Sequence, residues 1–151
     1  MPQIHYQQGL FHVTTNTQDR RRVCLKKGIP ELLIHTLDAT RSIHGAKLHA
    51  FCILPNHIHL LAPGEKGLSK FMQTFKSNST KEIRKQYKHL SKTFRWQAGF
   101  YDERIRDERQ RSAALHYILG NAVKHKLVKE IMDYPWTSLH FPSLIDPLDL
   151  W

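Results

Sequence analysis

The sequence KLHAFCILPNHIHLLA, residues 47–62, predicts two β-strands joined by a tight connection. Apolar side chains dominate residues 47–54 and 57–62, and the Pro55-Asn56 pair between them is typical of a turn. The two strands should therefore form an antiparallel hairpin. Because proline cannot adopt the positive φ of the common two-residue hairpin turns, we expect a connection slightly longer than two residues.

Outside this hairpin, the sequence predicts two more strands and three helices. Alternating apolar and polar residues indicate a strand over 9–17, and a further strand is expected over 99–106. Apolar residues at helical spacing predict helices over 28–43, 67–90 and 109–127.

The predicted element order is β-α-β-β-α-β-α, which is the order of a split β-α-β unit. We therefore predict the α+β class, with an antiparallel sheet and helices mainly on one face, as in a ferredoxin-like sandwich. The length of 151 residues fits a single domain. We expect that domain to span residues 1–140, with an irregular C-terminal tail over 141–151.

The charge balance favours a polyanionic partner. Lysine and arginine number 23 against 13 acidic residues, which gives a formal net charge of +10 and an isoelectric point near 9.8. Nucleic acid is a more common partner of such a domain than an anionic membrane. We found neither a bilayer-spanning apolar run nor a signal-peptide pattern, and two cysteines are too few for a disulfide scaffold. These features predict a cytoplasmic protein.

Two histidines, His57 and His59, occupy alternate positions of the second hairpin strand. Alternate strand residues share one face, so both rings should lie on the open face of the sheet, with Ile58 and Leu60 pointing into the core. Two imidazoles suit a divalent metal but need a third ligand. The same pattern also fits two surface histidines that bind nothing.

Tyr117 and Asn121 are four residues apart on the predicted helix 109–127. The apolar stripe of this helix consists of Leu115, Ile118, Leu119, Ala122 and Val123. At about 100° per residue, Tyr117 and Asn121 should lie roughly opposite the stripe, one above the other. A tyrosine in an amphipathic helix more often belongs to the core, and an asparagine is often simply solvated. Together they would place a hydroxyl nucleophile one turn from an amide oxygen that can bind a metal.

Basic residues in two regions predict contacts with a phosphodiester backbone. One region covers residues 66–95, and the other, 104–111, leads directly into the Tyr117 helix. Arg104 and Arg106 alternate on a predicted strand, so both should face one groove. Solvated helix faces are the usual alternative explanation for such runs. The residues predicted to bind DNA are Lys76, Lys81, Arg84, Arg95, Arg104, Arg106 and Arg109.

Four aromatic residues are interleaved with these cations, and exposed ones would stack on unpaired bases. We expect at least half of them to belong to the core instead. They are Phe94, Trp96, Phe100 and Tyr101.

Several segments together resemble a known family. ILPNHIHLL, residues 53–61, resembles the His-hydrophobic-His (HUH) motif of the small single-tyrosine transposases. One branch, the REP-associated tyrosine transposases, is similar to FRWQAGFYDERIRDE (94–108), LHYILGNAVKHKLV (115–128) and DYPWTSLH (133–140). The match runs in order from the first strand to about residue 140. A His-x-His pattern alone would also fit a cupin strand or a replication-initiator nuclease.

The resemblance implies a bacterial, nucleoid-associated enzyme of the HUH nuclease fold. It implies that His57 and His59 bind Mg²⁺ or Mn²⁺, that Asn121 is the third ligand and that Tyr117 is the nucleophile. The implied reaction is metal-dependent cleavage and rejoining of single-stranded or hairpin DNA, at palindromic repeats, through a 5′-phosphotyrosine. Relatives commonly carry proline where this chain has Ala122, and alanine suits a helix interior better.

Two other functions fit the sequence less well. One is a hairpin-DNA-binding protein that derives from such a transposase and does not cleave. The other is an RNA-binding module of similar topology, which would need exposed aromatic residues on the central strands. The sequence leaves open whether a homodimer forms, and whether Tyr117 serves the histidines of its own chain or those of another subunit.

Overall fold

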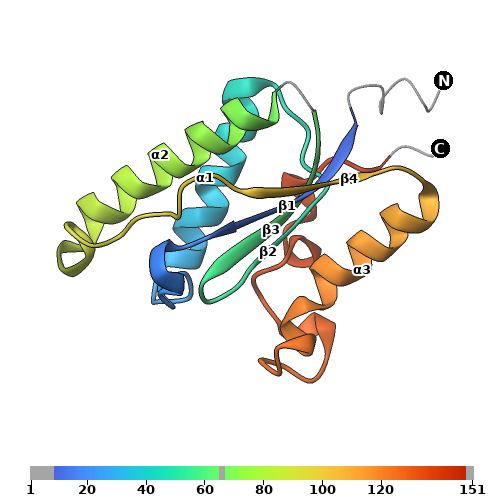
Figure 1. The fold of residues 1–151 in the computed structure, drawn as a ribbon. Helices are drawn as coiled ribbons and strands as arrows, with labels where there is room; N and C mark the ends of the chain where they lie inside the picture. Colours follow the sequence, from blue (N-terminus) through green and yellow to red (C-terminus); the bar gives the residue numbers. More distant parts are fainter. Residues whose placement is uncertain (1–8, 65–66, 149–151) are drawn as a thin grey trace.

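The computed structural model describes residues 9–64 and 67–148, which form a four-stranded sheet with three α-helices (Figure 1). The element order is β-α-β-β-α-β-α, which confirms the predicted order. The elements are β1 (Leu10–Asn16), α1 (Ile29–His44), β2 (Ala50–Ile53), β3 (His57–Pro63), α2 (Leu68–Gln86), β4 (Tyr101–Ile105) and α3 (Glu108–Lys124).

The sheet has the strand order β2-β3-β1-β4, and every neighbouring pair is antiparallel. Three residues, Leu54 to Asn56, connect β2 to β3, and the Leu54 amide donates to the His57 carbonyl at 2.8 Å. The connection between the two hairpin strands is therefore longer than two residues, as Pro55 predicted. The strand order is that of a ferredoxin-like sandwich, which confirms the predicted fold class.

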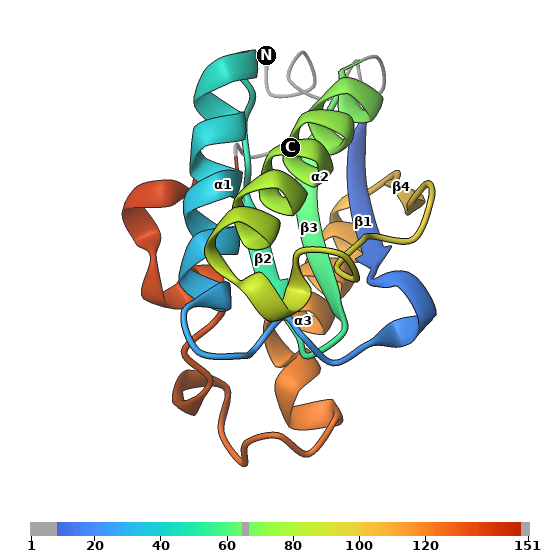
Figure 2. The same cartoon turned by 90° about the vertical axis from the view of Figure 1, so that its left-hand side faces the viewer.

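Helices cover both faces of the sheet, two on one face and one on the other (Figure 2). Phe11, Val13, Ile58 and Leu60 belong to the core shared with α1 and α2. On the opposite face, Leu10 and Leu61 pack with apolar residues of α3. The face that carries His57 and His59 was expected to be open, but α3 covers part of it, because Ala114, Ile118 and Ala122 pack there with Leu10 and Leu61.

The buried side of α3 differs from the predicted stripe. Asp107 caps the helix by accepting from the Gln110 amide at 2.8 Å, and the buried positions further along are Ala114, Ile118, Asn121 and Ala122. Three residues of the predicted stripe, Leu115, Leu119 and Val123, are only half-buried. Leu115 and Leu119 line a hollow whose other wall comes from the C-terminal segment. The helix is therefore rotated, relative to the prediction, so that Asn121 faces the sheet.

The chain after α3, residues 125–148, is the C-terminal segment, and it covers the outer edge of β2. The Ile53 amide donates to the Trp136 carbonyl at 2.9 Å, and the Phe51 amide donates to Ser138 Oγ at 3.1 Å. An unpaired strand edge invites association with other chains, so these bonds protect β2.

Residues after 140 are also tied to the domain, through Asp146. Its carboxylate accepts from the Leu48 amide at 3.0 Å and forms an ion pair with Arg41 at 3.2 Å. The whole C-terminal segment, from residue 125 to residue 148, contains the short 3₁₀ helices Ile131–Asp133, Ser138–His140 and Pro142–Leu144.

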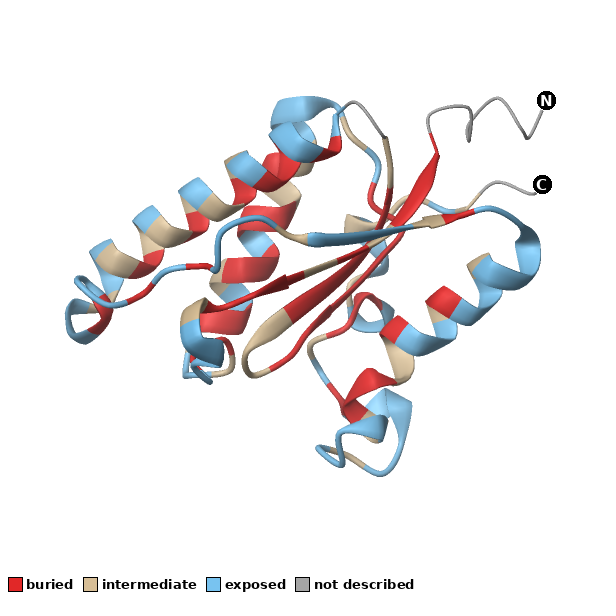
Figure 3. Ribbon diagram, viewed as in Figure 1, coloured by how far each residue is buried: buried red, intermediate tan, exposed pale blue. Residues whose placement is uncertain are grey.

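The central strands are largely buried, whereas the first half of β4 is exposed (Figure 3). β4 is the last strand of the sheet on this side, and no other strand of residues 9–64 and 67–148 pairs with its outer edge. Within the same residues, no helix has the length and hydropathy to cross a bilayer.

Candidate active site

A hollow of about 340 Å³ lies on the face of the sheet that α3 covers. It is formed where β1, β3 and β4 pass the middle of α3, and the loop after β1 closes one side. Residues from distant parts of the sequence therefore meet there, including the predicted His57, His59 and Tyr117. The lining residues are Thr14, Asn16, Arg20, His57, His59, Tyr101, Tyr117 and His125.

The two histidines of β3 lie side by side, with ring centroids 4.9 Å apart. His57 Nδ1 is 2.7 Å from Asn56 Oδ1. A carboxamide oxygen only accepts hydrogen bonds, so Nδ1 of His57 carries the proton and donates it. The other ring nitrogen, Nε2, then has a free lone pair.

His59 is held in a similar way by residues of β1. Its Nδ1 lies 3.0 Å from Thr14 Oγ1 and 3.0 Å from His12 Nε2. Its Nε2 is buried and has no hydrogen-bond partner in the part of the chain that the structure describes. A ring fixed through one nitrogen, with the other nitrogen free, is the usual arrangement of a metal-binding imidazole.

Both rings are neutral near pH 7. Burial, with smaller effects from His125 and Arg20, lowers the pKa of His57 to about 4. Burial, followed by the nearby His12 and His57, lowers the pKa of His59 to about 3. No proton has to be displaced at neutral pH before these nitrogens can bind a cation.

Tyr117 projects from α3 over the histidines and remains 41% exposed. Its ring centroid is 5.4 Å from that of His59 and 5.5 Å from that of His12. Lys124, two turns later, places its Nζ 4.6 Å from the centroid of the Tyr117 ring. As the periodicity predicted, this tyrosine is not a core residue, and its accessible side is next to the paired histidines.

Asn121 is fully buried, so the prediction that it lies opposite the buried stripe was wrong. The reason is the rotation of α3 described above, which turns this position toward β2 and β3. Its Oδ1 and Nδ2 have no hydrogen-bond partner among the described residues. Leaving a buried polar group unpaired costs about 1–3 kcal/mol, so a ligand at Asn121 would satisfy a group that the protein itself does not.

The donor set fits a divalent cation. Within residues 9–64 and 67–148, no three His, Cys, Asp or Glu side chains are grouped so as to hold a metal ion. A third protein ligand beside His57 and His59 would therefore be of another type, and a carboxamide oxygen such as that of Asn121 suits Mg²⁺ or Mn²⁺.

α3 runs without interruption through Ala122 to Lys124, so alanine in place of proline leaves Asn121 in regular helix.

Six residues of the site were not among the predicted site residues. Three of them, His12, Thr14 and Asn16, could have been found from the alternation of β1, which places them opposite Phe11 and Val13. A fourth, His125, follows Tyr117 by eight residues and directly follows the last residue of α3. The other two, Arg20 and Tyr101, reach the hollow only through tertiary packing. The six are His12, Thr14, Asn16, Arg20, Tyr101 and His125.

The predicted DNA-binding residues fall into separate groups. Four of them, Lys76, Lys81, Arg84 and Arg95, line one groove beside α2.

Only Arg104 of the pair Arg104 and Arg106 lies on β4, so the strand alternation that predicted a shared groove does not apply to them. Arg104 pairs with Phe11 across the sheet and thus lies on the face opposite Tyr117, whereas β4 ends at Ile105, before Arg106. Arg106 and Arg109 are exposed at the turn into α3 and in its first turn. The interleaved aromatic residues divide as expected, with Phe94 and Trp96 in the core and Tyr101 63% exposed.

A ferredoxin-like sandwich with a His-x-His strand beneath an exposed helical tyrosine is the arrangement of a single-tyrosine transposase. Residues 5–121 match the family model described as IS200-like transposase. The chain belongs to the IS200-like transposase family and, within it, to the REP-associated tyrosine transposases. It is therefore a transposase.

Relatives of known sequence support this assignment. A Haemophilus influenzae protein assigned to the REP-associated tyrosine transposases is 30% identical over 142 residues, covering 87% of this chain and 80% of that protein. The REP-associated tyrosine transposase of Escherichia coli K12 is 28% identical over 133 residues, covering 87% and 77%, respectively.

Solved structures support the fold. A REP-associated tyrosine transposase bound to a REP hairpin superposes with a TM-score of 0.75 at 24% identity, covering 97% of this chain and 87% of that chain. A Deinococcus radiodurans protein described as a transposase gives a TM-score of 0.56 at 21% identity, covering 72% and 87%, respectively.

Proposed function

We propose that this transposase cleaves and rejoins single-stranded or hairpin DNA at palindromic repeats, with Tyr117 as nucleophile and Mg²⁺ or Mn²⁺ as cofactor. One observation carries the proposal: His59 Nε2 and the Asn121 carboxamide are buried without hydrogen-bond partners in the described chain, and the exposed Tyr117, one helical turn before Asn121, has its ring against that of His59. The relative solved with a REP hairpin supports the choice of substrate.

The metal would be held by Nε2 of His57, Nε2 of His59 and Oδ1 of Asn121. A divalent ion at this position would polarise the phosphodiester and offset the negative charge that develops in the transition state. The three protein ligands would leave coordination positions open for phosphate oxygens.

The covalent step uses the Tyr117 hydroxyl. Its oxygen attacks phosphorus and loses the phenolic proton, while the P–O3′ bond breaks and the departing 3′ oxygen takes up a proton. The products are a 5′-phosphotyrosine and a free 3′-hydroxyl. Because the P–O bond to Tyr117 replaces the broken P–O3′ bond at similar energy, a second 3′-hydroxyl can attack the phosphotyrosine, release the Tyr117 hydroxyl and join new ends without ATP.

The surroundings of Tyr117 suit an anionic substrate. Arg20 lines the hollow, Lys124 lies against the tyrosine ring, and no carboxylate is among the lining residues. A hollow lined by cations and neutral groups concentrates phosphate near the nucleophile.

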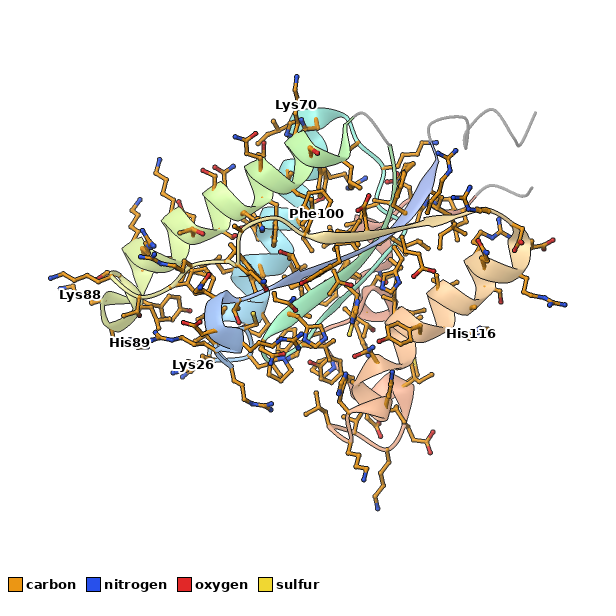
Figure 4. The ribbon with its side chains drawn as sticks, viewed as in Figure 1. Lys26, Lys70, Lys88, His89, Phe100 and His116 are labelled. Atoms are coloured by element: carbon orange, nitrogen blue, oxygen red, sulfur yellow. The ribbon has the colours of Figure 1, made fainter. Side chains whose placement is uncertain are left out.

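The test is formation of a covalent adduct. Purified protein, a hairpin oligonucleotide with single-stranded flanks, and Mn²⁺ or Mg²⁺ should give a product that survives SDS electrophoresis. Tyr117→Phe should remove this product and leave hairpin binding within about twofold of that of the wild type. His116→Ala is the matched control, because this neighbouring residue is exposed on the outer side of α3 (Figure 4).

Two results would contradict the proposal. If Tyr117→Phe still forms the adduct, another residue is the nucleophile. If the wild-type protein binds the hairpin but forms no adduct with either metal, the chain is a hairpin-binding derivative that does not cleave.

A further inference from the structure

A second and larger cavity, the α2 groove, lies between α2 and the extended segment 94–100, with a volume of about 800 Å³. The segment runs back along α2 before it enters β4, as both ribbon views show (Figures 1 and 2). Four cations and no carboxylate are among the residues that line the α2 groove. The cations are Lys76, Lys81, Arg84 and Arg95.

Two of these cations hold the groove in shape. Lys76 Nζ donates to the carbonyls of Gln97, at 2.7 Å, and of Gly99. Arg84 Nε donates to the Phe94 carbonyl at 2.9 Å. These bonds fasten the segment to α2, so the α2 groove exists before any ligand arrives.

The other two cations, Lys81 and Arg95, are exposed at the rim. Between the rims, the groove has an apolar floor. Trp96 and Met72 are buried there, and Trp96 Nε1 donates to Ser79 Oγ at 2.9 Å, which fixes the indole. Phe100 is half-buried and lies beside the start of β4 (Figure 4).

This chemistry favours unpaired nucleotides. A duplex presents its phosphates outside and keeps its bases stacked, so an apolar floor offers it nothing. A single strand has exposed base faces that stack on aromatic rings while its phosphates contact cations at the rim.

The α2 groove and the active site are on opposite sides of β4 and of the segment before it. Phe100 lines the groove, whereas Tyr101, the next residue, lines the hollow that contains Tyr117. Adjacent residues of an extended strand point to opposite faces, which explains this division. The two cavities are also joined by a backbone hydrogen bond, in which the Gln97 N–H donates to the Asn16 carbonyl at 2.9 Å. Gln97 lines the groove and Asn16 lines the hollow.

A strand of DNA can pass from one cavity to the other around β4. This strand is at the end of the sheet, and Tyr101 to Glu103 are exposed. No strand of the described chain pairs with the outer edge of β4, so the route crosses no hydrogen-bonded pair of strands.

We propose that the α2 groove is a second DNA subsite, which holds unpaired nucleotides of the same strand that Tyr117 cleaves. The strand passes around the edge of β4, with bases against Phe100 on one side and Tyr101 on the other. Lys81 and Arg95 contact its phosphates. This inference rests on the proposed function, since it assigns a ligand to a surface that adjoins the proposed active site.

The experiment measures binding in the Tyr117→Phe background, where no cleavage takes place. The probes are a fluorescein-labelled DNA hairpin with an eight-nucleotide single-stranded extension, at the 5′ or the 3′ end, and the same hairpin without an extension. Phe100→Ala and Lys81→Glu should each raise the Kd about tenfold for the hairpin extended at one of its two ends, the same end for both variants. This is the effect expected for loss of a stacked base or a phosphate contact. The Kd of the blunt hairpin should change less than twofold.

Lys70→Glu is the matched control, because Lys70 is on the same helix and points into solvent outside the groove (Figure 4). It should affect extended and blunt hairpins equally, through net charge alone. Lys81 is exposed, so Lys81→Glu keeps the test valid even if Phe100→Ala unfolds the domain.

Replacing single nucleotides of the extension by abasic sites locates the stacked base. At one position, the abasic substitution should raise the Kd for the Tyr117→Phe protein that retains Phe100. The same substitution should not raise the Kd further for the protein that also carries Phe100→Ala.

The subsite is overturned if both groove variants bind the extended hairpins normally, or if they weaken extended and blunt hairpins to the same degree. Failure of the proposed function has a different signature, since the protein with an intact Tyr117 would then form no covalent adduct.

Discussion

The ring of Tyr117 meets the ring of His59 edge-on, with centroids 5.4 Å apart and an interplanar angle of 86°. One residue comes from α3 and the other from β3, and both belong to the same chain. In this single chain, the helical tyrosine lies beside the histidine pair of the same chain. The contact is possible because Ile118 and Ala122 of α3 pack on the sheet, which brings the neighbouring Tyr117 close to β3.

Thr14 should control the metal affinity of His59. Its hydroxyl lies 3.0 Å from His59 Nδ1, so Thr14→Val leaves that nitrogen with His12 alone. Loss of such a supporting hydrogen bond typically weakens metal binding about 10- to 100-fold. Isothermal titration with Mn²⁺ measures the effect, and Thr14→Ser, which keeps the hydroxyl, should bind nearly as well as the wild type. Equal affinities for Thr14→Val and Thr14→Ser would show that the hydroxyl has no such role.

Asn121→Ala should have opposite effects on the metal-free and the metal-bound protein. It removes a buried carboxamide without partners in the described chain, and alanine has the higher helix propensity. In EDTA, we expect the free energy of unfolding to rise by about 1 kcal/mol.

The same variant should lose most of the additional stability that Mn²⁺ gives the wild type, because a ligand is missing. Urea unfolding with EDTA and with Mn²⁺ provides both values. A large loss of stability in EDTA would mean that Asn121 has a structural partner instead.

The metal-free protein should lose stability as the pH falls below about 6.5. Burial lowers the pKa values of His57 and His59 to about 4 and about 3. Between about pH 6.5 and those values, the unfolded chain binds protons that the folded chain does not, so acid favours unfolding.

The slope is at most about 1.4 kcal/mol per pH unit for each histidine, and smaller for His57, whose ring is partly in contact with solvent. Urea titrations in EDTA at several pH values provide the profile. A His57→Gln/His59→Gln protein should show a flatter dependence over this range. An unchanged dependence in that protein would assign the effect to other groups.

The C-terminal segment should contribute to stability through Asp146. Asp146→Ala removes the acceptor of the Leu48 amide and the ion pair with Arg41. A hydrogen bond to a charged group is worth about 1.5–3 kcal/mol, so we expect a loss of about 2 kcal/mol in urea unfolding. Asp146→Asn, which keeps an acceptor for the amide, should lose less. If neither variant changes the unfolding midpoint, the segment after residue 140 adds nothing to the stability of the domain.

The sequence alone determined the elements and one half of the site. The proline in residues 54–61 predicted the length of the hairpin connection, and the alternation of β3 predicted that His57 and His59 share a face opposite Ile58 and Leu60. These are local properties, since strand periodicity and turn chemistry depend on residues within a few positions of one another. The resemblance to the family supplied the roles that we propose for Tyr117 and Asn121.

Only the tertiary structure decided how α3 lies on the sheet. A helical wheel placed Asn121 away from the core, because Leu115 and Leu119 dominated the apolar stripe. In the folded chain, those leucines line a hollow beside the C-terminal segment, and the side with Ala114, Ile118 and Ala122 packs on the sheet. The sequence does not show which of two apolar surfaces a helix side will meet, so the angle of the helix, and with it the burial of Asn121, follows from long-range packing. The same packing brought Arg20 and Tyr101 to the histidine pair, from a loop and an edge strand with no local pattern that predicted it.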